Sequence, residues 1–210
     1  SMLQTTIGRI LLVLILLAMV SLLTFWLLRR RVRDWRAEVT LGRHLQATAA
    51  LVGLDRRKSR DLFRRVAKYR GPLPDRYPHV VQDANLKLAR QSMERDKVDE
   101  ALGWLARVVE PGLPKELQRS LLQLRLEALR QQGEVLPATL RREAEQAVER
   151  FPDDSKMLSV LRDLAEAEGN SDEALQWQEK IAKHAPPASI VGERQRYVDA
   201  LVTAGQRALV

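Results

Sequence analysis

An apolar run of nineteen uncharged residues, 10–28, limits what this chain can fold into more than any other feature. A helix rises about 1.5 Å per residue, so the run would be roughly 28 Å long, close to the hydrocarbon thickness of a bilayer. Its only polar side chains are those of Ser21 and Thr24, whose hydroxyls can bond to carbonyls of the preceding turn. The run therefore predicts a membrane-spanning helix over residues 10–28.

Charges on either side of this run predict its orientation. One positive residue, Arg9, precedes it, whereas five arginines follow it: Arg29, Arg30, Arg31, Arg33 and Arg36. Positively charged flanks remain on the cytoplasmic side of a membrane, so we expect the tail of residues 1–9 to cross and all later residues to remain cytoplasmic. A cleavable signal peptide is the alternative, but its charges would precede a shorter apolar stretch and a small-residue cleavage site would follow.

The rest of the composition predicts an all-α fold. Leu, Ala, Arg, Glu and Gln dominate, these are good helix formers, and the alternation of β-branched residues that indicates strands is almost missing. The chain has no cysteine, which excludes disulfides, thiolate metal sites and cysteine nucleophiles.

Positive charge is concentrated next to the predicted span. Residues 29–78 contain 15 Lys and Arg against 5 Asp and Glu, whereas residues 79–210 contain 19 against 22. Each Lys or Arg near an anionic leaflet adds about 1 kcal/mol of attraction, so we expect the basic segment 29–78 to contact lipid headgroups. The residues of this expected membrane surface are the five arginines above and Arg56, Arg57, Lys58, Arg60, Arg64, Arg65 and Lys68. Nucleic acid is the alternative partner, but no recognisable nucleic-acid-binding module accompanies the cluster.

Helix signals divide the basic segment into two helices. The first continues the predicted span to about Val52, and the second is capped by Asp55 and runs to about Tyr69. Two prolines then stop it, within residues 71–75.

Residues 79–210 repeat a pattern of paired helices. The tetrapeptide Asp-Glu-Ala-Leu occurs at 99–102 and again at 172–175, a separation of 73 residues, which is about two periods of 34 residues with a small insertion. A middle unit lies between them and ends at Phe151-Pro152. A further helix is expected over residues 190–204, and its unfinished repeat suggests a longer natural chain.

Over residues 81–187 this pattern resembles the tetratricopeptide repeat family. Small residues recur where paired helices approach most closely, and prolines recur at helix ends. The small residues are Ala89, Ala101, Ala128, Ala144 and Ala174, and the prolines are Pro111, Pro152 and Pro186. Arg162 and Asn85 depart from the pattern. The resemblance implies a solenoid of antiparallel helix pairs with a concave, partner-binding groove. Aligning the units places Arg90, Arg125, Lys156 and Asp163 near that groove.

The residues predict no catalytic chemistry. His44, His79 and His184 are isolated from one another, and the chain contains no phosphate-binding loop or nucleophile elbow. We therefore expect no enzyme activity, cofactor or metal. Trp104 and Trp177 follow the two tetrapeptides at the same offset, which favours a packing role, with a partner-facing role as the alternative.

Together these features predict a membrane-anchored scaffold that gathers proteins of a membrane, secretion or polymer-export complex, alone or as a homo-oligomer. The Arg- and Leu-rich composition is typical of a bacterial protein, so we expect the inner membrane. Two alternatives remain open. The chain could be the anchoring part of a larger enzyme or signalling protein, or a periplasmic repeat chaperone in the reverse orientation.

Overall fold

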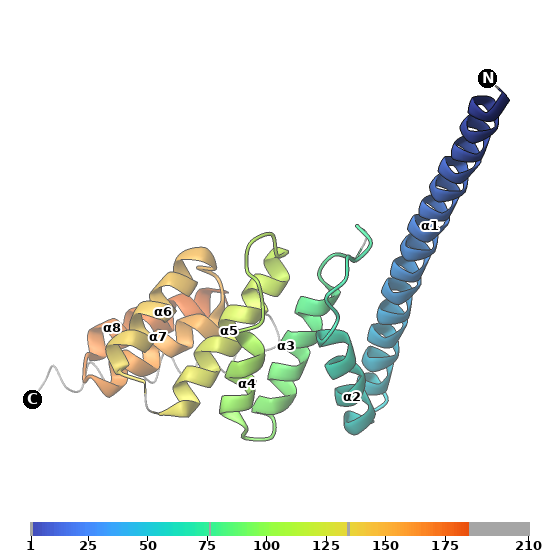
Figure 1. Ribbon diagram of the computed structural model, residues 1–210. Coiled ribbons are helices and arrows are strands. Elements are labelled where there is room, and N and C mark those ends of the chain that lie inside the picture. The colour runs from blue at the N-terminus through green and yellow to red at the C-terminus, as the bar shows by residue number, and fades with distance from the viewer. Residues whose placement is uncertain (1, 76, 134, 185–210) are drawn as a thin grey trace, which may run out of the picture. The chain divides into compact units, whose positions relative to one another are not determined.

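A computed structural model describes the backbone of residues 2–75, 77–133 and 135–184, and their side chains from residue 16 onward. Within these residues the chain forms eight helices and no strand, which confirms the predicted all-α fold (Figure 1). The helices are α1 (Met2–Val52), α2 (Arg56–Ala67), α3 (Val80–Met93), α4 (Val98–Leu105), α5 (Lys115–Gln132), α6 (Pro137–Arg150), α7 (Ser155–Ala167) and α8 (Ser171–His184). The helix expected over 190–204 lies outside the described residues.

The chain divides into two compact units, residues 1–84 and 85–210. The sequence places this boundary six residues earlier, after Pro78, where the charge balance changes. The later boundary agrees with a contact inside the first unit, because Asp83 in the first turn of α3 lies 2.7 Å from the imidazole Nε2 of His44 on α1. Val80 and Ala84 beside it are buried.

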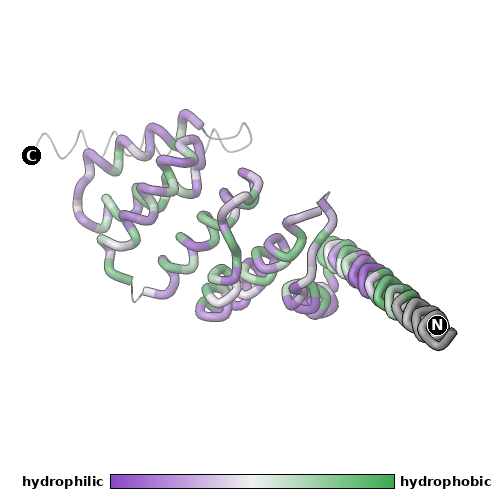
Figure 2. The backbone as a smooth tube through the Cα atoms, turned by 45° about the horizontal axis from the view of Figure 1, so that its top comes forward, coloured by the Kyte–Doolittle hydropathy of each residue, from purple (hydrophilic) through white to green (hydrophobic). Residues whose placement is uncertain are grey.

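Helix α1 is continuous over 51 residues, so the predicted span and its extension form one helix. Every large apolar side chain of residues 16–28 is at least half exposed. Figure 2 shows this hydrophobic stretch followed by the hydrophilic arginines. In the part of the chain described with side chains, no helix is long and apolar enough to cross a membrane. The side chains of residues 10–15, which belong to the predicted span, lie outside that part.

A tight turn reverses the chain between α1 and α2. The Asp55 amide donates to the Ala50 carbonyl at 2.9 Å and the Leu54 amide donates to the Leu51 carbonyl at 3.2 Å, so the last carbonyls of α1 are satisfied. This pattern requires a left-handed residue, and Leu54 adopts φ 63°. Asp55 then accepts a bond from the Lys58 amide and caps α2, as predicted. Helix α2 ends at Ala67, two residues before the predicted end.

Helix α2 returns along α1 through a face of small residues (Figure 1). On α1, the buried Ala37, Thr40 and Ala47 share one face, since they are separated by three and by seven residues. On α2, Phe63 is fully buried, and its ring meets His44 edge to face with centroids 5.7 Å apart. This contact sets the register of the two helices: Phe63 is level with His44.

In the second unit, α5, α6, α7 and α8 enclose a continuous core. Its buried members are Leu126, Leu140, Ala144, Ala147, Phe151, Met157, Val160 and Leu161, and Trp177 of α8 packs against them. Gly133 (φ 70°) ends α5, and Asp154 caps α7 by accepting bonds from the amides of Lys156 and Met157. The five alanines at the expected close approaches are all buried: Ala89, Ala101, Ala128, Ala144 and Ala174.

Candidate partner-binding groove

A shallow depression of about 210 Å³ lies between α5 and α7. Positions three, four and seven residues apart share one helix face, so each helix contributes a single stripe. The lining residues are Gln123, Leu126, Glu127 and Arg130 of α5, and Lys156, Met157, Ser159 and Val160 of α7. Leu126, Met157 and Val160 are buried and form an apolar floor, while Glu127, Arg130 and Lys156 are exposed at the rim.

Two side-chain contacts fix the walls of this groove. The Gln123 amide nitrogen donates to Asp154 Oδ2 at 2.7 Å, and so joins α5 to the cap of α7. Farther along, the Arg130 guanidinium donates to Asp163 Oδ2 at 2.8 Å. Because both ends of the groove are tied by bonds between α5 and α7, its width is set before any ligand enters.

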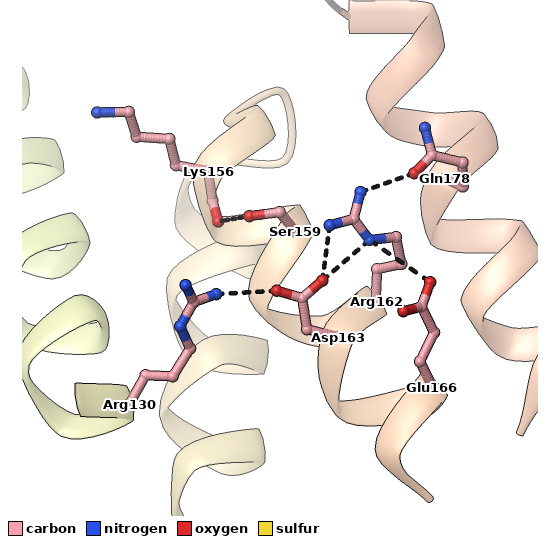
Figure 3. A network of polar contacts seen from close by, with 7 residues as sticks. All are labelled: Arg130, Lys156, Ser159, Arg162, Asp163, Glu166 and Gln178. Carbon is pink, nitrogen blue, oxygen red and sulfur yellow. Dashed lines mark hydrogen bonds and ion pairs between the residues drawn. The ribbon is translucent and has the colours of Figure 1, made fainter. Parts of the chain in front are cut away.

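Asp163 also holds the arginine that departs from the repeat pattern (Figure 3). The Arg162 guanidinium donates to Asp163 Oδ1 at 2.6 Å and to the Gln178 side-chain oxygen on α8 at 2.8 Å. Its side chain is only 18% exposed. Arg162 thus stands where the repeat pattern expects a small residue, and its polar contacts link α7 to α8. Asp163 is in turn shared between two guanidinium groups, those of Arg130 and Arg162.

The four residues predicted near the groove do not all reach it. Lys156 lines the groove, and in Figure 3 its ammonium points away from the network. Asp163 lies beside the groove, bonded to Arg130. Arg125 instead faces α6, where its guanidinium lies 3.3 Å from Glu143. Arg90 is exposed on α3 and is not among the residues that line this depression.

Sequence reasoning missed Gln123, Glu127 and Arg130, which line the groove on α5. Their steps of four and three residues were available as a signal, since they place all three on one face. Among the described residues, neither the Glu127 carboxylate nor the Lys156 ammonium has an ion pair or hydrogen bond. The groove therefore presents one unpaired carboxylate and one unpaired ammonium group above an apolar floor.

On α6, an arginine clamps the turn between α7 and α8. The Arg141 guanidinium donates to Glu173 Oε1 and to Glu168 Oε2, each at 2.7 Å. The hydrogen bond from Arg141, with a second from the Trp177 indole, holds the pKa of Glu173 below its usual range. The bond to Glu173 raises the pKa of Arg141. These bonds tie three helices together.

The two tryptophans lie in protein contacts. Trp104 is 9% exposed, and the Arg107 guanidinium covers its ring at 4.5 Å. Trp177 is half-buried, and the Lys180 ammonium lies 4.2 Å from its ring centre. In the part of the chain that the structure describes, no group of His, Asp or Glu residues could hold a metal ion.

The predicted membrane surface is split between two helices. The five arginines at positions 29–36 are exposed on α1, directly after the apolar stretch, and the Arg30 guanidinium lies 5.7 Å from the Trp26 ring. The other seven residues lie on α2 or at its end; Arg60 and Arg64 are half-buried there and the remaining five are exposed.

No protein-family model matches this chain, and no curated protein sequence matches it significantly. The resemblance to tetratricopeptide repeats accordingly stays a prediction from the sequence pattern.

Proposed function

We propose that this protein is a membrane-anchored scaffold that binds a protein partner through the groove between α5 and α7. The observation that carries the proposal is the groove's construction: an apolar floor, walls tied at Asp154 and Asp163, and unpaired opposite charges on Glu127 and Lys156. A peptide with apolar side chains and at least one charge of each sign complements this surface. The helix pairs then act as tetratricopeptide-type repeats.

The same proposal assigns residues 10–28 to a membrane crossing. The support is the exposed apolar surface of α1 up to residue 28, which no described residue covers, and the five arginines that follow it. Trp26, stacked with Arg30, suits the headgroup boundary, where amphipathic rings concentrate. In this arrangement the helix pairs lie in the cytoplasm, and a bacterial inner membrane is the membrane that the composition favours.

Site-specific cross-linking in the native membrane tests the groove. A photoreactive amino acid at Ser159, which lines the groove, should give a discrete cross-linked product, whereas the same group at Gln146, exposed on α6, should not. Lys156→Glu should abolish the product, and Arg142→Glu, an equal charge change on α6, should retain it. Both substitutions are at exposed positions and should shift stability by no more than about 0.5 kcal/mol. Equal products at Ser159 and Gln146 would show that the groove is not the binding surface.

A further inference from the structure

The register of α1 and α2 sets how far the α2 cations lie from the end of the apolar stretch. Phe63 is level with His44, which follows Leu28 by 16 residues. At about 1.5 Å per residue, that level is roughly 24 Å beyond Leu28 along the helix axis. Since α2 runs back along α1, Arg57 lies roughly 9 Å farther out and Arg65 roughly 3 Å nearer.

These positions put the α2 cations beyond the reach of lipid headgroups, given the membrane crossing proposed above. The headgroup layer adds about 5–8 Å to each side of the hydrocarbon, and salt screens charges over about 8 Å. Arg57 lies roughly 33 Å and Arg65 roughly 21 Å from Leu28, and an average helix tilt of about 20° shortens both distances by less than a tenth. The arginines at positions 29–36, by contrast, lie within the headgroup layer or just outside it.

The outer face of α2 is nevertheless suited to binding another molecule. We define this face by the residues Leu54, Arg57, Lys58, Asp61, Leu62 and Arg65. The five that belong to α2 are related by spacings of three, four and seven residues, so they share one side of the helix, and Leu54 lies in the turn just before it. A depression of about 370 Å³ lies on this side, lined by Asp55 and by all of these residues except Leu54. Arg57, Lys58 and Arg65 have no ion pair with any described residue, whereas Arg125, Arg130 and Arg141 in the second unit are all paired.

Leu54 adds an exposed apolar contact beside these cations. Its side chain is 79% exposed, and its φ of 63° is a conformation that bulky residues rarely adopt. Glycine would satisfy the same turn with less strain. A leucine that is strained and 79% exposed indicates that the side chain serves a contact outside the chain.

We propose that the outer face of α2 docks an acidic segment of another protein, with Leu54 receiving an apolar side chain of that segment. Charge complementarity selects the occupant: three unpaired cations outnumber the two carboxylates of the depression, Asp55 and Asp61, and lie beside a leucine. A nucleic acid is the less suitable ligand, because the face contains no aromatic ring on which a base could stack. The docking site is separate from the groove between α5 and α7.

Binding of a defined acidic probe tests this site. The probe is a fluorescent 15-residue helical peptide of glutamate and leucine, measured by anisotropy against the full chain in nanodiscs of uncharged lipid. The triple substitution Arg57→Ala, Lys58→Ala and Arg65→Ala should weaken binding at least tenfold. A matched triple, Lys115→Ala, Arg142→Ala and Lys183→Ala, removes three exposed cations of the second unit and should change binding less than twofold. Leu54→Gly should weaken binding severalfold with no change in charge. Equal losses in the two triples, or tighter binding of a single-stranded oligonucleotide to the same face, would overturn the proposal.

A distance measurement separates this inference from the membrane crossing on which it partly rests. The chain has no cysteine, so Arg57→Cys and Arg33→Cys each give a unique labelling site. With an energy acceptor on the lipid headgroups, the label at 33 should be strongly quenched and the label at 57 weakly. Equal, strong quenching would place α2 on the lipid and overturn the docking site. Weak quenching at both positions would refute the membrane crossing instead, and peptide binding would still decide the role of α2.

Discussion

At the scale of single residues, three helices of this chain end in the same hydrogen-bonded turn with a different residue at its left-handed position. Leu54, Asp96 and Gly169 adopt φ values of 63°, 55° and 76°. In each turn the next amide bonds back five residues; Lys97 reaches Ser92 and Asn170 reaches Ala165. Glycine fits this conformation without strain and aspartate tolerates it, but for leucine the left-handed conformation costs about 1–2 kcal/mol of conformational free energy.

Leu54→Gly should therefore stabilise the first unit. Relief of the left-handed strain outweighs the extra backbone entropy that glycine gives the unfolded chain, which leaves a net gain of about 0.5–1 kcal/mol. Urea denaturation of the full chain in a mild detergent measures it, with Gly169→Leu as the reverse control, expected to lose at least about 1 kcal/mol. A loss of stability in Leu54→Gly would mean that the leucine packs against its own chain.

The pair formed by Arg141 and Glu173 predicts a specific acid sensitivity. The pKa of Glu173 is lowered in the folded state from 4.5, so its stabilisation is complete above pH 4.5 and is lost as the pH falls through the folded-state value. Glu173→Gln should cost about 1 kcal/mol at neutral pH and should flatten the decline of stability below pH 4.5. Glu179→Gln, exposed on the same helix, is the control and should change the stability at neutral pH by no more than about 0.5 kcal/mol. Parallel profiles for native chain and Glu173→Gln would contradict the assignment.

At the scale of helices, the two neighbouring carboxylates before α7 have different roles. Asp154 is buried, caps two amides of α7 and accepts a bond from Gln123, whereas the Asp153 side chain is 58% exposed. Asp154→Ala should cost about 1–2 kcal/mol, because the cap is lost and a buried amide loses its partner. Asp153→Ala should cost no more than about 0.5 kcal/mol. Thermal melts compare the two directly, and equal costs would show that the cap contributes little.

Helix starts and ends were predictable because they depend on local residues. Asp55 caps α2 by accepting a bond from the Lys58 amide, within one turn, and the structure places this cap as expected. The direction of a groove side chain was not predictable with the same accuracy. Neighbouring helix positions point about 100° apart, so an alignment uncertain by one residue exchanges a groove position for one facing the next helix. Arg125, which pairs with Glu143 on α6, shows this effect, because the next residue, Leu126, is the one that lines the groove.

At the scale of the whole molecule, the Lys and Arg residues that the sequence groups into one basic segment form two separate groups of cations. Composition alone treats residues 29–78 as one basic segment. The turn after Val52 and the contact between Phe63 and His44, which joins positions 19 residues apart, reveal that the α2 cations lie along α1 at a distance from the arginines at positions 29–36. The distance between the two groups of cations depends on contacts between residues far apart in the sequence. Neither composition nor helical periodicity predicts such contacts.

This separation predicts which charges orient the chain in a membrane. Lys and Arg set orientation only within about 15–20 residues of a span. Replacing Arg29, Arg30, Arg31, Arg33 and Arg36 with glutamine should therefore give mixed orientations, since Arg9 before the span and Arg43 after it would be the flanking cations left. Replacing five exposed cations of α2, namely Arg56, Arg57, Lys58, Arg65 and Lys68, should leave the orientation unchanged. A cysteine introduced at the exposed Glu179, labelled in sealed vesicles by an impermeant maleimide, reports the side on which the helix pairs lie. If the two variants label alike, the arginines at positions 29–36 do not determine the orientation.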